Sequence, residues 1–321
     1  MTLFRPVPVA ELDRQDHLIR LAGGWCWFDP TGVPDVELAR LTAPRVPIAG
    51  LSLERPRIMG ILNITPDSFS DGGDLATVAQ AVARAKAVVG VADIIDIGGE
   101  STRPGAAPVP VSVEIARVVP VIAAIRAAGI TLPISVDTRK AQVAAAALRA
   151  GASMVNDVSA LQFDPDMAAV VAAADVPVCL MHALGDPATM QDDPHYGDVV
   201  AEVYQFLQDR LDMAVTAGIG RHRIIVDPGI GFGKTLQHNV TLLRHLDVLH
   251  GLGQPILLGV SRKRFIGQIG GQIGGVSGAR DRLAGSLAVA LHAVAQGVQI
   301  LRVHDTTETR QALSLHQAVT G

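Results

Sequence analysis

The sequence has few cysteines and few aromatic residues. Cys26 and Cys179 are the only cysteines among 321 residues, and aromatic residues make up 3% of the chain. Two cysteines without a framework spacing exclude a disulfide-stapled fold and fit a reducing compartment. We therefore expect a core built from aliphatic side chains.

Strong charge of one sign is also absent. Lys and Arg number 27 against 31 Asp and Glu, a formal net charge of −4. No basic tract or basic helix face stands out, so nucleic acid is not expected as a partner. The first residues contain early acidic side chains and no apolar signal core, which predicts no targeting segment.

Long apolar runs are rare. The longest stretch without formal charge is Leu283 to Leu301, and Gly297 divides it. Its length alone would suit a membrane span, but Ser286 and His292 interrupt the apolar run. We expect a helix followed by a strand here, and no membrane association.

Aliphatic residues are abundant and periodic: 49% of the chain is hydrophobic and 18% is charged, which excludes a disordered chain. From Arg57 onward, short β-branched runs alternate with helical segments, as buried parallel strands do with their crossover helices. The eight runs cover residues 57–65, 92–99, 133–137, 153–159, 177–182, 223–229, 255–261 and 299–305. Eight βα units predict an α/β fold of the (β/α)8 TIM-barrel type, with a doubly wound open sheet as the alternative.

Residues 1–56 do not share this rhythm. We expect them to form an N-terminal extension of small strands or a helix packed on the barrel, with a role that the sequence leaves open. Residues 57–321 are then the barrel and its catalytic domain.

Hydrogen-bond acceptors lie where the third, fourth and sixth predicted strands end. They are Asp137, Asn156 and Asp227. In TIM barrels the carboxyl ends of the strands form the active-site face. This set suits a flat heterocycle that presents several N–H donors.

Cationic side chains lie at the ends of the last two strands and after the second. They are Lys263, Arg302 and His304, with Arg103. Such barrels often bind phosphate near strands seven and eight, so an anionic tail on the substrate is expected. Each acid or amide could instead cap the following helix, but caps do not use Lys, Arg or His.

Two other motifs point elsewhere and are rejected. The segment GIGFGKT (229–235) looks like a phosphate loop, but Pro228 stands where that loop requires glycine. The histidines lack metal-ligand spacing, and His238, His245 and His250 are expected at the surface of a helix, so zinc is not expected.

Eight motifs in register resemble those of the dihydropteroate synthases, from about residue 57 to the end. They are GILNITPDSFSDGG (60–73), DIGGESTRPGA (96–106), SVDT, NDVSA, LMH, DPGIGFGK, GVSRK and RVHD. The resemblance implies a (β/α)8 enzyme that joins a dihydropterin diphosphate to p-aminobenzoate in folate biosynthesis. It also implies a transferase that is a cytoplasmic, Mg²⁺-dependent homodimer and a sulfonamide target.

The resemblance also implies roles for particular residues. The expected pterin-binding residues are Asp137, Asn156, Met181, Asp227, Phe232 and Lys263. The expected diphosphate-binding residues are Asn63, Thr102, Arg103, Arg302 and His304, with Asn63 also a Mg²⁺ ligand. The expected p-aminobenzoate-binding residues are Phe69, Pro104, Phe232, Ser261 and Lys263, and the expected catalytic residues are Asp71, Arg103, Asp137 and Lys263.

The sequence departs from the family pattern in two places that could alter loop closure. The segment after Gly73 lacks an aromatic residue, and residues 267–275 form a glycine-rich imperfect duplication. Two alternatives stay open: a methyltetrahydrofolate–corrinoid methyltransferase, which would share the pterin carboxylates, and a non-catalytic pterin-binding paralogue.

Overall fold

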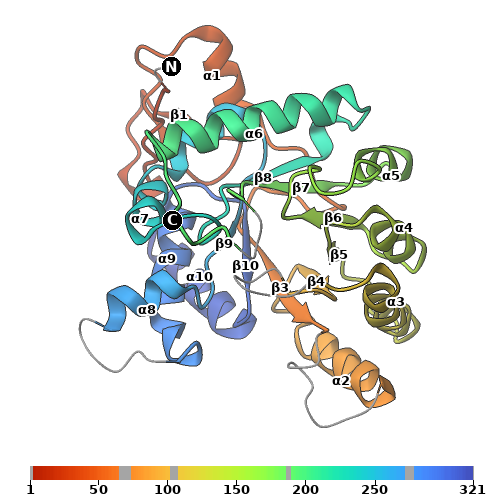
Figure 1. Cartoon of the computed structure of the whole chain (residues 1–321). Coiled ribbons are helices and arrows are strands. Elements are labelled where there is room, and N and C mark those ends of the chain that lie inside the picture. Colours follow the sequence, from red (N-terminus) through yellow and green to blue (C-terminus); the bar gives the residue numbers. More distant parts are fainter. Residues whose placement is uncertain (1–2, 65–73, 102–107, 186–188, 272–277, 321) are drawn as a thin grey trace.

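A computed structural model describes residues 3–64, 74–101, 108–185, 189–271 and 278–320, without the side chains of residues 74–77 and 280. Eight parallel strands lie at the centre, with helices around them (Figure 1). The strands are β3 (Arg57–Asn63), β4 (Ile94–Gly98), β5 (Ile134–Asp137), β6 (Met154–Asp157), β7 (Val178–Met181), β8 (Ile224–Asp227), β9 (Leu257–Gly259) and β10 (Ile300–Val303). All eight predicted strands are confirmed, each within the range expected from its aliphatic run.

The strands follow the order β8-β7-β6-β5-β4-β3-β10-β9. The two ends of this order meet at an isolated parallel bridge between Val226 and Ile256, which brings β8 beside β9. The sheet is therefore a (β/α)8 barrel, and the open-sheet alternative is wrong.

Helices follow the strands and cover the outside of the barrel (Figure 1). They are α2 (Asp74–Ala87), α3 (Val111–Ala127), α4 (Ala141–Arg149), α5 (Met167–Ala174), α6 (Val199–Thr216), α7 (Leu236–Arg244), α8 (Arg264–Gly271), α9 (Leu283–Ala295) and α10 (Thr306–Thr320). Short 3-10 helices cover Arg221–Arg223 (η3), Leu246–Leu252 (η4) and Arg280–Arg282 (η5). The uncharged stretch forms α9 and β10 as predicted, and no helix in the described ranges is long and apolar enough to span a bilayer.

The described part of the extension contains η1 (Glu11–Asp13), strands β1 (Ile19–Arg20) and β2 (Trp27–Phe28), and helix α1 (Asp35–Thr42). Phe28 and Leu41 are fully buried in a small core of its own. Arg45 donates hydrogen bonds to the carbonyl of His250, and Trp25 Nε1 donates to the carbonyl of Val294. These carbonyls precede β9 and β10, so the extension packs on the amino-terminal side of the barrel.

The barrel interior is filled at that same end. Seven strands contribute buried side chains to one cluster: Met59, Ile94, Met154, Cys179, Ile225, Leu257 and Ile300. Ile48 and Leu53, which precede β3, complete it. The packed amino-terminal half leaves the opposite, carboxyl end of the strands to carry polar side chains.

Candidate active site

The predicted acceptors and cations lie around the carboxyl ends of the strands. Asn63, Asp137, Met181 and Asp227 are the last residues of β3, β5, β7 and β8. Asn156 and Arg302 lie in β6 and β10, and Ser261, Lys263 and His304 follow β9 and β10. Strand register therefore brings residues far apart in sequence to one end of the barrel.

Two glycines keep room between these side chains. A Cβ atom on Gly98 would lie 3.6 Å from Asn63 Oδ1 and 3.7 Å from Asp137 Oδ2. A Cβ atom on Gly259 would lie 4.0 Å from both Asp227 Oδ2 and Arg302 Cδ. Asn63 and Asp137 thus flank β4, and Asp227 and Arg302 flank β9, on the barrel's polar end.

Arg302 of β10 forms hydrogen bonds with acidic side chains of β4 and β5. Its Nη2 donates to Asp137 Oδ2 at 2.6 Å, and its Nε donates to Asp96 Oδ2 at 2.6 Å. Asn156 Nδ2 donates to the same Asp96 oxygen at 3.5 Å. The arginine does not pair with Asp305, which instead binds Arg262. Arg302 therefore lies among the predicted pterin acceptors as well as near the predicted anion site.

One carboxylate oxygen of Asp137 is available to accept a hydrogen bond from a ligand. Its Oδ1 and the Oδ1 of Asp96 are buried and have no hydrogen-bond partner within the described ranges. Leaving a buried acceptor unpaired costs on the order of 1–3 kcal/mol. Such atoms in a polar barrel mouth are typical of a site whose ligand supplies the missing N–H groups.

The buried carboxyl groups have raised pKa values. Burial raises the pKa of Asp137 to about 7; Arg302 opposes this rise, and Asp96 adds to it. Burial raises the pKa of Asp227 to about 6, against the lowering effects of the Gly229 amide, Lys263, Arg302 and Lys234. Burial would lower the pKa of Arg302, but Asp96 and Asp137 raise it above its ordinary value, so Arg302 stays charged.

Lys263 and Phe232 lie together at the loop that follows β8. Lys263 Nζ lies 4.2 Å from the centre of the Phe232 ring, and a Cβ atom on Gly231 would lie 3.6 Å from that nitrogen. Met181, which pairs in register with Asp227, is 4% exposed. Two apolar side chains and a cation thus border the acceptors, as a flat ring would require.

His304 and Ser261 join the last two strands at this end. His304 Nδ1 lies 3.1 Å from Ser261 Oγ, and the His304 amide donates to the same oxygen at 3.2 Å. Arg262, between Ser261 and Lys263, has a φ of 59°, and its amide donates to Ser286 Oγ at 2.9 Å. This left-handed backbone conformation turns the chain at Arg262, so that Ser261 and Lys263 on either side of it can face the site.

Five predicted site residues lie outside the described residues. They are Phe69 and Asp71 in the first predicted loop, and Thr102, Arg103 and Pro104 in the second. Part of the glycine-rich segment 267–275 lies outside as well.

Sequence reasoning missed two buried residues of the site. Asp96 is not among the acceptors that the sequence predicted, although it binds Arg302 and lies two residues before Gly98. Lys234 was considered only within a rejected phosphate loop, yet it is 3% exposed beside His182. Spacing within one strand could have indicated Asp96, whereas His182, a partner of Lys234, follows a different strand.

The prediction that His250 lies at the surface is wrong. His250 is 0% exposed because it lies in η4 under the extension, and its Nε2 lies 3.0 Å from the carbonyl oxygen of Gln296. His238 and His245 are half-buried. No group of three or more potential metal-ligating His, Cys, Asp and Glu side chains occurs in the described ranges.

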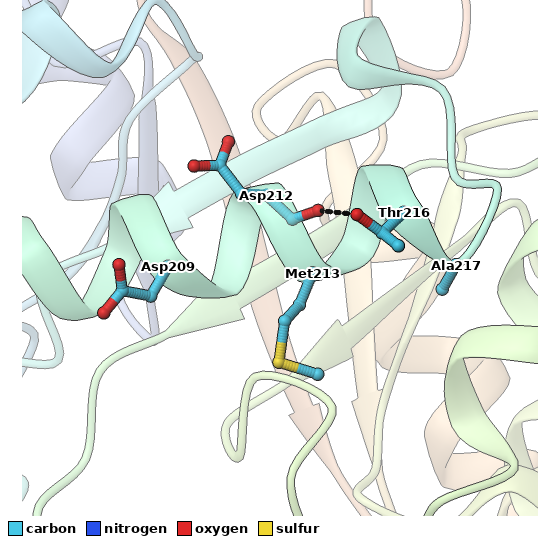
Figure 2. A pocket seen from close by; sticks show the side chains of 5 residues that line it. All are labelled: Asp209, Asp212, Met213, Thr216 and Ala217. Atoms are coloured by element: carbon cyan, nitrogen blue, oxygen red, sulfur yellow. Dashed lines mark hydrogen bonds between the residues drawn. The ribbon is translucent and has the colours of Figure 1, made fainter.

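A shallow depression on α6 lies away from the strand ends. Asp209, Asp212, Met213, Thr216 and Ala217 line it (Figure 2). Thr216 Oγ1 donates to the carbonyl of Asp212 at 2.8 Å, an ordinary bond within a helix. This depression contains none of the predicted site residues.

Comparison with known proteins places the barrel in a family. The pterin binding enzyme family matches residues 59–304. The dihydropteroate synthase of Synechocystis sp. is 46% identical over 83% of this chain and 91% of its own length. The structure of Xanthomonas albilineans dihydropteroate synthase with 4-aminobenzoic acid is similar with a TM-score of 0.79 and 51% identity, covering 86% of this chain and 98% of that one.

A sulfonamide drug complex of Yersinia pestis dihydropteroate synthase is also similar, with a TM-score of 0.78 and 45% identity. It covers 84% of this chain and 96% of that chain. Family match, identity and coverage agree with the motifs and with the barrel. The chain belongs to the pterin-binding enzymes and, within them, to the dihydropteroate synthase family.

Proposed function

We propose that this protein catalyses the dihydropteroate synthase reaction. The amine of p-aminobenzoate attacks the exocyclic methylene of a 7,8-dihydropterin-6-ylmethyl diphosphate, the C–O bond breaks, and diphosphate leaves. A proton is lost from the amine, and 7,8-dihydropteroate forms. The observation that carries this proposal is the set of buried acceptors, Asp137, Asn156 and Asp227, beside Arg302 and Lys263 at one end of the barrel.

The acceptors suit the pterin. Asp137, Asn156 and Asp227 are 7%, 3% and 5% exposed, so a ring edge bound to them is withdrawn from water. Ionised carboxylates beside the ring would favour the positive charge that develops on the pterin as the leaving group departs. Met181 and Phe232 would border the ring, and Lys263 would bind its polar edge.

The cations suit the diphosphate. Arg302 and His304 lie two residues apart at the end of β10, and alternate residues of a strand face the same side. We propose that they bind the diphosphate with Asn63, Thr102 and Arg103, and stabilise its growing charge. Phe69, Pro104 and Ser261 would border p-aminobenzoate, and Asp71 and Arg103 would act with Asp137 and Lys263 in the chemical step.

The donor set fits a Mg²⁺ ion that arrives with the substrate. Mg²⁺ keeps several waters and is usually bound by one or two protein oxygens and substrate phosphates. Asn63 offers an amide oxygen beside Gly98, and the described residues contain no three-ligand cluster that would hold a metal alone. When bound, Mg²⁺ would offset the negative charge of the diphosphate.

We also propose a cytoplasmic homodimer. The support is the family membership and the two free, buried cysteines, which suit a reducing compartment. Sedimentation of the purified protein at the mass of one chain would contradict the dimer.

The test is diphosphate release measured with both substrates, with each alone, and with a sulfonamide. We expect release only with the dihydropterin diphosphate and p-aminobenzoate together, and inhibition that p-aminobenzoate overcomes. Methyl transfer from methyltetrahydrofolate to a corrinoid would instead identify a methyltransferase. Pterin binding without turnover would identify a non-catalytic paralogue.

A further inference from the structure

Lys234 is a buried cation to which the proposed chemistry assigns no role. It ends the GIGFGK segment between β8 and α7 and is 3% exposed. A buried lysine is costly to hold unless its N–H groups are paired, so its partners indicate its role.

Three close acceptors surround the Lys234 ammonium. Nζ lies 2.8 Å from His182 Nδ1, 3.0 Å from the carbonyl oxygen of Gly229 and 3.0 Å from that of Phe232. An ammonium has three N–H donors, which match these acceptors, whereas a neutral amine would leave one unpaired. Burial and the charge of Lys234 hold the pKa of His182 well below its usual value, so its neutral ring can accept.

Two of these acceptors are the backbone carbonyl oxygens of Gly229 and Phe232, and both residues contact side chains that are predicted to bind the pterin. The Gly229 amide donates to Asp227 Oδ1 at 2.7 Å, so fixing Gly229 also fixes the carboxylate. The ring of Phe232 lies under Lys263 Nζ at 4.2 Å. Lys234 thus holds the backbone that sets both Asp227 and the Phe232–Lys263 pair.

The third acceptor ties this loop to the end of β7. A Cβ atom on Gly229 would lie 1.8 Å from the carbonyl oxygen of His182, and one on Gly233 would lie 2.6 Å from that of Leu184. Glycine is therefore required for the loop to approach this closely. Several carbonyl oxygens lie close together at this contact, and the positive charge of Lys234 offsets their partial negative charges.

We propose that Lys234 is a positioning residue of the pterin site, which binds Gly229, Phe232 and His182 and thereby orients Asp227 and Lys263 toward the ring. Lys234 does not itself touch the substrate. The inference rests on the proposed function, because it assumes that the ring between these side chains is a pterin.

The charge of Lys234 supports the same role. The Gly229 amide, Lys263, Arg302 and, to a smaller extent, Lys234 lower the pKa of Asp227 against the effect of burial. Burial lowers the pKa of Lys234 itself to about 7; Asp227 opposes this decrease, and Lys263 adds to it. Removing Lys234 therefore both frees the loop and makes the Asp227 carboxylate harder to ionise.

The experiment measures binding of 6-hydroxymethyl-7,8-dihydropterin by calorimetry from pH 5.5 to pH 8.5, a range chosen to span both carboxyl groups. Lys234→Met removes the ammonium and keeps the length of the side chain. Arg45→Met is the matched control, since Arg45 is another buried cation bound to carbonyl oxygens, those of Arg40, Ala43 and His250. Thermal melts of all variants measure the general cost of losing a buried cation.

We expect Lys234→Met to weaken pterin affinity at least about tenfold at pH 6.5, where most of Lys234 is charged, and the acid loss of affinity to move to higher pH. Arg45→Met should lower the melting temperature without either change. Lys234→Gln, which keeps N–H donors but not the charge, should retain more affinity and still show the pH shift.

Two results would overturn the inference. The first is wild-type affinity and an unmoved pH profile in a folded Lys234→Met protein. The second is loss of the folded state in both Lys234 variants, which would assign Lys234 to folding alone. A wild-type protein that binds no dihydropterin would contradict the proposed function, and this inference with it.

Discussion

Asp227 illustrates how a carboxyl group that we propose for binding is buried at a cost in stability. Its pKa of about 6 lies above its ordinary value of 3.8, so the folded protein holds this proton to higher pH than the unfolded chain. Stability from this group is therefore present at low pH and is lost as pH rises through about 6. The ionised form, which in our proposal accepts hydrogen bonds from pterin N–H groups, is the one that lowers stability.

Asp227→Asn should separate binding from stability. We expect pterin affinity to fall by several kcal/mol, since a site built around substrate N–H groups loses heavily when an acceptor becomes a donor. At pH 8 the variant should be no less stable than wild type, and more stable by up to about 3 kcal/mol, because it carries no buried charge. Its Oδ1 can still accept from the Gly229 amide.

Calorimetry with dihydropterin and urea unfolding at pH 5 and pH 8 would measure both effects. Asp209→Asn is the control, because Asp209 is an exposed residue of α6. Unchanged pterin affinity in a folded variant would remove Asp227 from the pterin site.

The pH dependence of the wild type follows from the same groups. Asp137 and Asp227 have pKa values of about 7 and about 6, so both protonate as pH falls from 8 to 5. We expect dihydropterin affinity to decrease over this range, in the direction opposite to stability. An affinity that stays constant from pH 8 to pH 5 would contradict this assignment.

Arg302→Ala tests whether one guanidinium serves both the diphosphate and the buried carboxylates. The sequence predicts a role at the diphosphate, and the structure adds ion pairs to Asp96 and Asp137. We expect a larger loss of affinity for the dihydropterin diphosphate than for hydroxymethyl dihydropterin. The second ligand should also bind more weakly, because Asp137 loses the cation that lowers its pKa.

Paired titrations of the two ligands, with Arg264→Ala as an exposed control, would decide this. Equal losses for both ligands would confine Arg302 to the carboxylates. A collapsed thermal melt would assign it a structural role.

At the scale of elements, a buried ionic cluster joins β4 to α3 and α4. Lys140 Nζ lies 2.9 Å from Glu100 Oε1, 2.6 Å from Glu114 Oε2 and 2.7 Å from the carbonyl oxygen of Val109. Glu100 also accepts from the Val109 amide at 2.8 Å. The cluster fixes Val109 to the end of β4, just before α3.

Lys140→Met should destabilise the protein by about 3–5 kcal/mol, because two buried carboxylates lose their shared cation. Urea unfolding at pH 7 would measure this loss. Lys86→Met, at an exposed position of α2, should change stability by less than about 0.5 kcal/mol. A change below about 1 kcal/mol in Lys140→Met would show that water or a shifted side chain replaces the ammonium.

The elements themselves were readable from the sequence. Buried parallel strands are unbroken aliphatic runs, so PVCLMH and RIIVDPG predicted β7 and β8 closely. The predicted strand ends placed Asp137, Asp227 and Arg302 at one end of the barrel, because strand direction alone determines at which end a residue lies. Pairings across the barrel were not readable: Arg302 binds Asp96 and Asp137, which precede it by 206 and 165 residues.

Local patterns also misled where tertiary contacts decide. The helical spacing of His250 predicted a surface position, but Arg45 and the carbonyl of Gln296 enclose it. Lys234 belongs to a motif that looks like a phosphate loop, but one of its partners, His182, lies 52 residues earlier. Contacts between segments far apart in sequence, rather than periodicity, create both environments.

At the scale of the whole molecule, the described part of the extension packs on the barrel at the end opposite the candidate site. Arg5 Nε binds the fully buried Asp247 side chain at 2.8 Å, and Ile48 packs inside the amino-terminal end of the barrel. The Xanthomonas albilineans structure covers 86% of this chain and 98% of its own, so related barrels are shorter.

Removing residues 1–44 should lower the melting temperature and leave substrate affinity unchanged, since the described contacts lie at the end opposite the site. Ile48 and Leu53 stay in this variant to fill the barrel. Differential scanning calorimetry and dihydropterin titration would measure the two effects. Loss of pterin affinity in a variant that still melts cooperatively would give the extension a role in binding.

Barrel closure has a consequence for motion within the native state. Neighbouring strands pair over several residues, whereas β8 and β9 meet at an isolated bridge between Val226 and Ile256. Asp227 follows one side of this seam, and Lys263 follows the other. A ligand bound to both residues would hold β8 and β9 together where the described strands pair over the fewest residues. When pterin binds, amide hydrogen exchange at this junction should therefore slow more than elsewhere.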